Sequence, residues 1–240
     1  MCGLSAIYSY GAEAPPVDQS ELNKISDHMT VRGPDGEGQW VSKNGKLGLA
    51  HKRLAIIDTS DHGAQPMALL DDSGQEVLLI TYNGEIYNFE ALREELQQQG
   101  HRLTTRSDTE VLLHLYDRYG ADMVEKLRGM YAFVIWDNRC NGIFMARDPF
   151  GIKPLYYSDD GQTIRIASQV KALLAGNKIG GTLDPAGHVG FFLLGYVPEP
   201  HTLYADIQAV PSGTAIWLEE GGNRKITNFF DVRKHLANRV

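Results

Sequence analysis

The chain places one of its two cysteines, Cys2, directly after Met1. If Met1 is removed, Cys2 carries a thiol and a free α-amine on neighbouring atoms. A cysteine thiol ordinarily has a pKa of about 8.5, so it needs a base, and an α-amine with a pKa of about 7.7–8.0 could serve. Gly3 lacks a Cβ, which would let a substrate approach the backbone beside the thiol. The alternatives are an incidental cysteine at a fraying end and a glycine that simply starts a strand.

A second pair of residues could stabilise the anion that forms when a thiolate attacks an amide. The segment "YNGEIYN" places Asn83 and Gly84 after an apolar run. An Asn side-chain amide and a Gly backbone N–H at a rigid strand end are suitable donors for an oxyanion. Taken alone, however, Asn-Gly is first of all a turn signal, and a plain turn is the favoured interpretation of these two residues.

Charged residues elsewhere could recognise a free α-amino acid, which needs a cation for its carboxylate and an anion for its ammonium. Arg53 lies in the otherwise apolar segment "AHKRLAIID", and a guanidinium can pair with a carboxylate through two parallel bonds. Asp108 in "RSDTEVLL" is the anionic candidate, with Glu85 as a second. The alternatives are a structural salt bridge for Arg53 and a helix cap for Asp108.

The other conspicuous residues carry weaker signals. The eight histidines are scattered without ligand spacing, so we expect no metal site. Cys140 falls in a predicted hairpin turn and is interpreted as incidental. The segment "RGPDGEG" (32–38) is either a mobile flap or a connection. The segment "GIKPLYY" (151–157) is expected to be a turn and strand rather than a phosphate loop.

Strands and helices must position these residues. The helical patterns cover 88–100, with Asn88 as cap, 107–120, capped by Ser107 or Asp108, and 168–176. Strand-like runs, joined in one case by a clear hairpin, favour antiparallel sheets covered by helices; these runs are 3–9, 48–57, 76–82, 129–136 and 142–147. We predict one compact domain over residues 2–213, followed by a basic tail, residues 214–240, with no core of its own.

Composition excludes several classes of protein. With 23 Lys and Arg against 30 Asp and Glu, the net charge is −7, which argues against a nucleic-acid partner. Two cysteines cannot form a disulfide framework, no signal peptide is recognisable, and no apolar run is long enough to span a membrane. We therefore expect a cytoplasmic protein that does not bind membranes, with homo-oligomerisation left open.

Ordered motifs along nearly the whole chain carry a family resemblance. The chain resembles the class II glutamine amidotransferases, which are N-terminal-nucleophile hydrolases, and most closely the glutaminase half of the asparagine synthetase family. The matching stretches are "MCGLSAIY", "RGPDGEG", "AHKRLAIID", "QPM", "YNGEIYNFEALREEL", "SDTEVLLHLY", "GMYAFVIWD", "RDPFGIKPLYY", "ASQVKALLA" and "GYVPEPHTLY".

The resemblance implies an α+β fold, an αββα four-layer sandwich of two antiparallel sheets between helical layers. It also implies that Cys2 is the nucleophile after loss of Met1 and that Asn83 and Gly84 form the oxyanion hole. The implied glutamine-binding residues are Arg53 for the carboxylate, Asp108 for the ammonium, Glu85 at the same end, and Leu54 and Ile57 along the pocket. The implied reaction is hydrolysis of the glutamine side-chain amide to glutamate and ammonia through a thioester on Cys2.

Two departures from the family pattern qualify this assignment. Gln169 stands where the family typically has Glu, which affects a contact towards the acceptor domain. The family's SGGxDS pyrophosphate-binding loop is absent from the 240 residues. We therefore expect no cofactor in this chain, with ATP and Mg²⁺ confined to a synthetase domain supplied in cis or in trans. The nitrogen acceptor, aspartate or another carboxylate, is not encoded here.

Two other functions compete with the glutaminase. One is another N-terminal-cysteine amide hydrolase of the acylase type. The other is a non-catalytic module that binds glutamine or a partner protein. The combination of Arg53 and Asp108 favours a zwitterionic substrate over a simple acyl amide.

Overall fold

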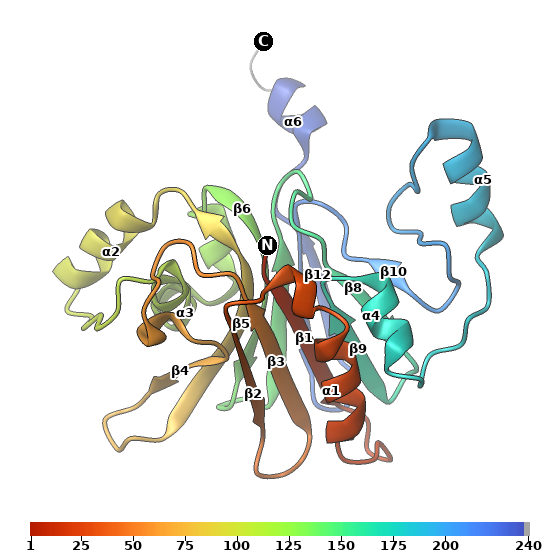
Figure 1. Cartoon of the computed structure of the whole chain (residues 1–240). Helices are drawn as coiled ribbons and strands as arrows, with labels where there is room; N and C mark the ends of the chain where they lie inside the picture. Colours follow the sequence, from red (N-terminus) through yellow and green to blue (C-terminus); the bar gives the residue numbers. More distant parts are fainter. Residues whose placement is uncertain (238–240) are drawn as a thin grey trace.

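The computed structural model describes residues 1–237, which form two antiparallel six-stranded sheets packed face to face (Figure 1). The strand order is β10-β8-β9-β1-β3-β2 in the first sheet and β12-β11-β7-β6-β5-β4 in the second. The strands of the first sheet are β1 (Gly3–Ser9), β2 (Gly36–Val41), β3 (Leu47–Arg53), β8 (Tyr156–Asp159), β9 (Thr163–Ala167) and β10 (Gln208–Ala209). Those of the second are β4 (Met67–Leu70), β5 (Glu76–Ile86), β6 (Gly129–Asp137), β7 (Gly142–Arg147), β11 (Thr214–Glu219) and β12 (Arg224–Asn228).

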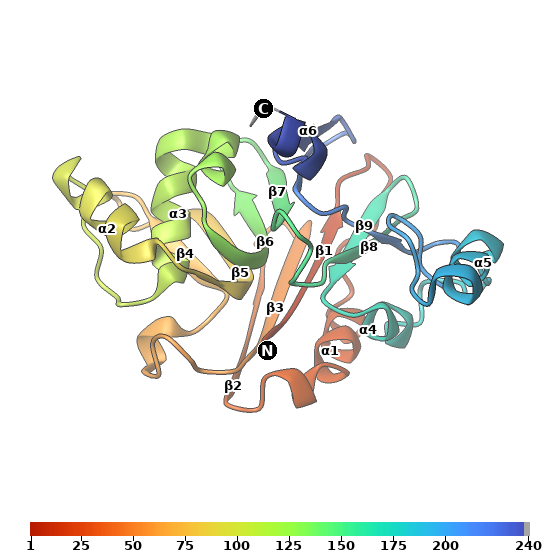
Figure 2. The same ribbon diagram turned by 90° about the horizontal axis from the view of Figure 1, so that it is seen from above.

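Helices cover both outer faces of the sandwich. Seen from above, α1 and α4 lie on one side and α2 and α3 on the other (Figure 2). The α-helices are α1 (Gln19–Asp27), α2 (Phe89–Gln98), α3 (Asp108–Tyr119), α4 (Val170–Ala175), α5 (Pro185–Leu194) and α6 (Val232–Ala237). Short 3₁₀ helices are η1 (Thr30–Arg32), η2 (Asp61–Gly63) and η3 (Gly120–Glu125). The predicted α+β, αββα four-layer architecture is therefore confirmed.

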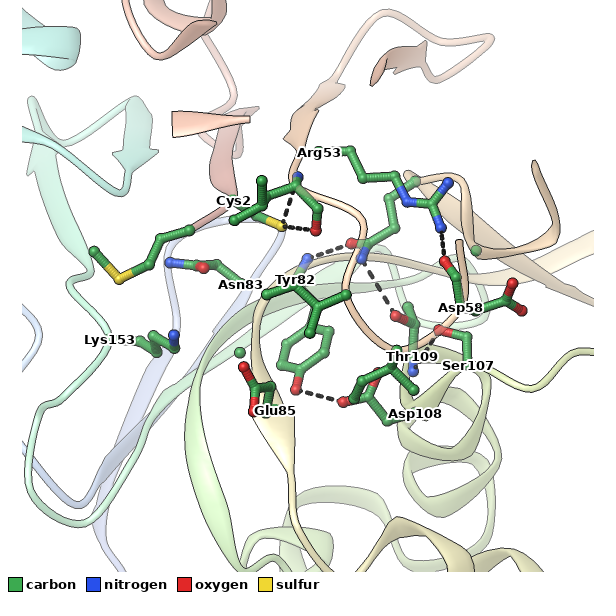
Figure 3. Close-up of a pocket in the computed structure, with 17 residues that line it drawn as sticks. Cys2, Arg53, Asp58, Tyr82, Asn83, Glu85, Ser107, Asp108, Thr109 and Lys153 are labelled. Atoms are coloured by element: carbon green, nitrogen blue, oxygen red, sulfur yellow. Dashed lines mark hydrogen bonds between the residues drawn. The ribbon is translucent and has the colours of Figure 1, made fainter. Parts of the chain in front are cut away.

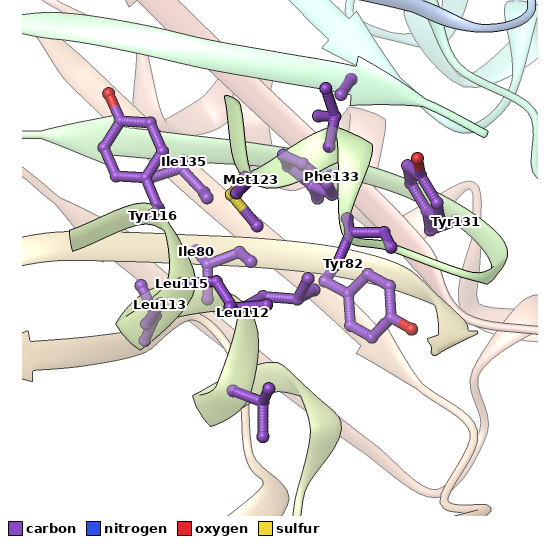
Figure 4. Packing of buried hydrophobic residues seen from close by; sticks show 14 of the residues in the cluster. Ile80, Tyr82, Leu112, Leu113, Leu115, Tyr116, Met123, Tyr131, Phe133 and Ile135 are labelled. Atoms are coloured by element: carbon purple, nitrogen blue, oxygen red, sulfur yellow. The ribbon is translucent and has the colours of Figure 1, made fainter. Parts of the chain in front are cut away.

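Three apolar clusters hold the four layers together, because successive side chains of a strand point to opposite faces. In β5, Leu79 joins the cluster between the sheets, whereas Ile80 and Tyr82 join the cluster under α3. Figure 4 shows this outer cluster, in which Leu112 and Leu115 of α3 lie beside Ile80 and Tyr82 of β5. A third cluster lies between the first sheet and helices α1 and α4. The helical layers are thus fixed by burial of one face each.

Several predicted elements change in detail. The strand predicted for 48–57 ends at Arg53, where the chain leaves the sheet. The strand predicted for 76–82 continues to Ile86, so Asn83 and Gly84 lie inside β5 opposite Ala132 and Tyr131 of β6. The favoured interpretation of Asn-Gly as a turn is wrong, because pairing with β6 outweighs the local turn preference.

At the start of α2 the predicted cap is wrong, whereas at the start of α3 one of the two predicted caps, Ser107, is confirmed. The Asn88 side chain does not cap α2; it donates to Lys126 O at 3.0 Å and accepts from Arg128 N at 3.0 Å. Ser107 caps α3 by accepting from Thr109 N at 3.1 Å. Asp108 is therefore the first residue of α3 rather than its cap, and its carboxylate is free for other contacts.

The domain boundary predicted after residue 213 falls inside the second sheet. β11 pairs with β7 from Thr214 opposite Arg147 onwards, and β12 pairs with β11. Ile216 and Leu218 are buried in the cluster between the sheets. The predicted tail therefore contributes two strands to the core, and only α6 follows them within the described residues; residues 238–240 lie outside these. No helix among residues 1–237 is long and apolar enough to cross a bilayer.

Candidate active site

One pocket gathers every site residue that the sequence predicted. Seventeen residues line it, and they come from the start of β1, the segment after β3, the end of β5, the start of α3 and, for Lys153, the segment between β7 and β8 (Figure 3). The eight predicted residues among them are Cys2, Arg53, Leu54, Ile57, Asn83, Gly84, Glu85 and Asp108. These positions are far apart in the chain, so the two sheets bring them together.

Cys2 lies at the entrance to β1 and is half-buried. Its Sγ accepts a hydrogen bond from Leu54 N at 3.3 Å, and its carbonyl accepts from Arg32 Nε at 2.9 Å. Cys2 is thus held at its thiol by the residue that follows β3 and at its carbonyl by Arg32 of η1. A Cβ on Gly3 would lie 2.8 Å from Met29 Cβ, so close packing on Met29 accounts for the glycine.

The predicted oxyanion pair faces the same pocket. The Asn83 side chain is 1% exposed, and its Nδ2 has no hydrogen-bond partner among the described residues. A buried amide donor without a partner is unfavourable unless a ligand satisfies it. Gly84 must be glycine, because a Cβ there would lie 2.4 Å from Met130 O. The end of β5 therefore presents a rigid, unsatisfied donor to the pocket.

Arg53 ends β3 and reaches into the segment that follows it. Its Nη1 donates to Ser60 O at 2.8 Å and its Nη2 donates to Asp58 O (Figure 3). Both acceptors are neutral carbonyls, and no carboxylate lies within 4.0 Å of this guanidinium among the described residues. A guanidinium carries five N–H donors. Within residues 1–237, Arg53 therefore has no acidic partner, and its remaining N–H groups can bind an anion.

Asp108 provides a buried carboxylate on the opposite wall. It is 4% exposed, and its Oδ2 accepts from Tyr82 Oη at 2.8 Å and from Ile86 N at 3.1 Å. Burial raises the pKa of Asp108, although the bonds from Ile86 and Tyr82 oppose this shift. Burial and the neighbouring Asp108 raise the pKa of Tyr82 well above its usual value, so Tyr82 stays a donor. An ammonium ion placed here would find a carboxylate fixed by the β5–α3 contact.

The remaining predicted residues line the pocket and have fewer hydrogen bonds that fix them. Glu85 is half-buried and follows the oxyanion pair along β5. Leu54 is held against Cys2 through its backbone, and Ile57 is 38% exposed.

Three residues that sequence reasoning did not select also build the site. Gln65 accepts from Tyr82 N at 2.6 Å and donates to Thr109 Oγ1 at 3.2 Å, which ties β5 to α3 behind the pocket. Arg32 orients Cys2, and Lys153 lines the pocket. Each lies in a motif already quoted, "QPM", "RGPDGEG" or "GIKPLYY", which was the available signal. The segment 32–38 runs from the end of η1 into β2, and Asp35 N donates to Arg53 O at 2.9 Å.

No histidine lines this pocket among the described residues, so the chemistry has no imidazole base within reach. His51 is buried between the sheets, and burial together with the charge of Arg53 lowers its pKa to about 3. No group of three or more potential metal ligands occurs in residues 1–237. Cys140 lies in the β6–β7 turn outside the pocket, where burial and Asp137 raise its pKa to about 11. Cys2 is thus the one cysteine of the described residues placed for chemistry.

Comparisons with known proteins show the family of this chain. A family model described as a glutamine amidotransferase domain matches residues 1–230. The chain is 39% identical over 232 residues to "Asparagine synthetase [glutamine-hydrolyzing] 1" of Bacillus subtilis, covering 96% of the chain and 35% of that protein. It is 37% identical over 218 residues to "Putative asparagine synthetase [glutamine-hydrolyzing] 2" of Methanocaldococcus jannaschii, covering 85% and 41%. The chain therefore spans only about two fifths or less of these relatives.

The fold comparison defines the class of protein. This chain is similar to the structure of glutamine phosphoribosylpyrophosphate amidotransferase from B. subtilis complexed with ADP and GMP, with a TM-score of 0.64 and 23% identity. The match covers 95% of this chain and 49% of that amidotransferase chain. The two-sheet sandwich is thus the fold of that amidotransferase, the N-terminal-nucleophile hydrolase fold that the resemblance implied. Within that class, the chain belongs to the glutamine amidotransferase domain family, as its motifs predicted.

Proposed function

We propose that this chain hydrolyses the side-chain amide of glutamine to glutamate and ammonia, with Cys2 as nucleophile. The observation that carries the proposal is the single pocket that joins the Cys2 thiol, the unpartnered Asn83 amide, the uncompensated Arg53 guanidinium and the buried Asp108 carboxylate. Each of these groups matches one part of a zwitterionic amino acid with a terminal amide. A simple acyl amide would leave both charged residues without a partner.

The pocket can orient glutamine in one way. The α-carboxylate binds the free N–H groups of Arg53, and the α-ammonium binds the Asp108 carboxylate, which Tyr82 and Ile86 hold in place. The side chain then extends towards Cys2 and Asn83. Leu54 and Ile57 line this path, and Glu85 adds negative charge at the ammonium end.

The reaction follows from these positions once Met1 is removed. The free α-amine of Cys2 accepts the thiol proton, and the thiolate attacks the amide carbon while the C=O electron pair moves to oxygen. Asn83 Nδ2 and the Gly84 N–H donate to that oxyanion. When the C–N bond breaks, the α-ammonium returns its proton to nitrogen and ammonia leaves. Water then attacks the thioester with the α-amine as base, so glutamate forms and the thiol is restored.

We further propose that the ammonia supplies an ATP-dependent, asparagine-synthetase-like amidation. The names of the curated relatives and their greater length support this step. The synthetase domain would act in cis or in trans, and it would hold ATP and Mg²⁺, because no pyrophosphate-binding SGGxDS loop occurs in this sequence.

The test compares the wild-type chain with Cys2→Ala and, as a matched control, Cys140→Ala. Intact mass establishes the loss of Met1, and ammonia release from glutamine is measured beside circular dichroism. We expect Cys2→Ala to abolish ammonia release while the fold persists, and Cys140→Ala to remain active. Ammonia release by Cys2→Ala, or hydrolysis of acyl amides in preference to glutamine, would contradict the proposal.

A further inference from the structure

The segment "RDPFGIKP" (147–154) is far more tightly organised than an ordinary connection. Asp148 is fully buried, and its carboxylate is the common acceptor for a ring of backbone N–H groups. These donors are Tyr131 at 3.2 Å, Phe150 at 3.0 Å, Ile152 at 3.0 Å and Lys153 at 2.9 Å. The backbone of the turn therefore folds around the Asp148 carboxylate, which fixes it through these hydrogen bonds.

Arg147 fixes the same turn from the other side. Its Nε donates to Lys153 O at 2.8 Å, and its Nη2 donates to Gly151 O at 2.8 Å. Gly151 has a φ of +63°, and a Cβ there would lie 2.9 Å from Arg147 Nη2. Both backbone polar groups of Lys153 are thus bonded to buried charged residues. These hydrogen bonds exceed what a simple strand connection needs. They fix the backbone position from which the Lys153 side chain extends.

The Lys153 side chain itself is exceptional among the buried cations. Lys153 is 5% exposed, yet it lines the active-site pocket. The other buried cations of the described chain all have carboxylate partners: Lys52 pairs with Asp27 and Glu37, Arg165 with Glu21 and Asp160, and Arg147 with Glu199. Within residues 1–237, no carboxylate lies within 4.0 Å of Lys153 Nζ, and no hydrogen bond forms there. Lys153 Nζ is not among the buried polar atoms of the described residues that lack a partner, so it opens onto the pocket, where an anion can reach it.

The position of Lys153 indicates which anion that is. Figure 3 draws Lys153 on the side of Asn83, away from Arg53 and Asp58. Arg53 already serves the α-carboxylate end of the substrate, so a second cation for that group is not needed. At the Asn83 end, negative charge develops on the Cys2 sulfur and on the amide oxygen. A fixed charge in a site with little solvent acts strongly on such charge.

We propose that Lys153 is a third, charged stabiliser of the reacting centre, which acts on the Cys2 thiolate and on the oxyanion bound by Asn83. The effect of Lys153 on the oxyanion rests on the proposed glutaminase function, whereas its electrostatic effect on the Cys2 thiolate does not. The "RDPFGIKP" turn is then part of the active site, with Asp148 and Arg147 as positioning residues for this lysine.

The test measures the field at Cys2 without using glutamine. In a Cys140→Ala background, Cys2 is alkylated with anionic iodoacetate and with neutral iodoacetamide, and the ratio of the two rate constants is compared between variants. Both reagents react with the same thiolate, so the ratio reports the charge met by the incoming carboxylate. We expect Lys153→Met to lower this ratio about tenfold. Lys153→Arg should preserve it within about threefold, and the matched control Lys43→Met, an exposed lysine outside the pocket, should leave it unchanged.

A second measurement separates the reaction role. In glutaminase assays, Lys153→Met should lower kcat by about 10- to 100-fold with little change in KM, because the negative charge on sulfur and oxygen develops during the reaction and not when glutamine binds. An unchanged alkylation ratio in folded Lys153→Met would overturn the proposal. If Lys153→Met does not fold, Lys153→Gln decides by the same criterion. An altered alkylation ratio in a chain that releases no ammonia from glutamine would refute the glutaminase function while supporting the lysine's electrostatic role.

Discussion

Replacing Asn83 by Leu should change activity and stability in opposite directions. The Asn83 side chain is 1% exposed, and its Nδ2 has no partner among the described residues. Without substrate, this amide therefore destabilises the native state by the desolvation cost of an unsatisfied buried polar group, about 1–3 kcal/mol. A leucine of similar size removes that cost. We expect Asn83→Leu to raise the free energy of unfolding by about 1 kcal/mol, which corresponds to a rise in Tm of about 2–4 °C.

The same substitution removes a donor to the oxyanion. The loss of one such donor typically lowers kcat by about 10²- to 10³-fold. Ammonia release from saturating glutamine measures this effect, and thermal unfolding followed by circular dichroism measures stability. The two assays on one variant thus test whether Asn83 is kept for chemistry at a cost in stability.

Asn88→Leu is the matched control, because Asn88 lies outside the pocket and both polar ends of its side chain are bonded, to Lys126 O and Arg128 N. It should lose about 1–3 kcal/mol of stability and retain its activity. The reasoning would be refuted if Asn83→Leu lost as much stability as Asn88→Leu, or if it kept glutaminase activity within tenfold of the wild type.

Further predictions concern substrate binding and local structure. Because the α-ammonium of glutamine needs an ionised Asp108, whose pKa is raised by burial, KM should rise as the pH falls through that pKa; Asp108→Asn should show a high KM without this pH dependence. Gly151→Ala should cost about 1–2 kcal/mol in urea unfolding, because φ is +63° there; an unchanged midpoint would show that the turn can relax. Ser107→Ala should cost about 0.5–2 kcal/mol through loss of the α3 cap, whereas Ser107→Asn should restore the midpoint, and equal losses in both would argue against capping.

Local sequence patterns predicted much of the fold correctly. The runs rich in β-branched and aromatic residues at 3–9, 129–136 and 142–147 appear as β1, β6 and β7, and the apolar faces of α2 and α3 are buried as expected. The two helices are predictable because their apolar residues recur at the helical period, and the three strands because their residues suit a sheet that is buried on both faces.

Predictions failed where a distant segment decided the outcome. Asn-Gly prefers a turn locally, but β6 extends β5 through Asn83 and Gly84. The residues after 213 look like a tail, but β7 recruits them as β11. Local propensity amounts to about 1 kcal/mol or less per residue, so long-range pairing and burial override it.

The sequence alone determined which groups are available for chemistry: a cysteine behind Met1, an Asn-Gly pair, an arginine in an apolar strand and an aspartate at a helix start. It also identified their family through ordered motifs. Only the tertiary structure decided that these groups share one pocket and that, within residues 1–237, the Asn83 amide lacks a partner. The structure also decided that Lys153 lines this pocket with no counter-ion among the same residues. The physical reason is that proximity and unmet hydrogen bonds depend on how two sheets stack, and no local stretch of sequence encodes that stacking.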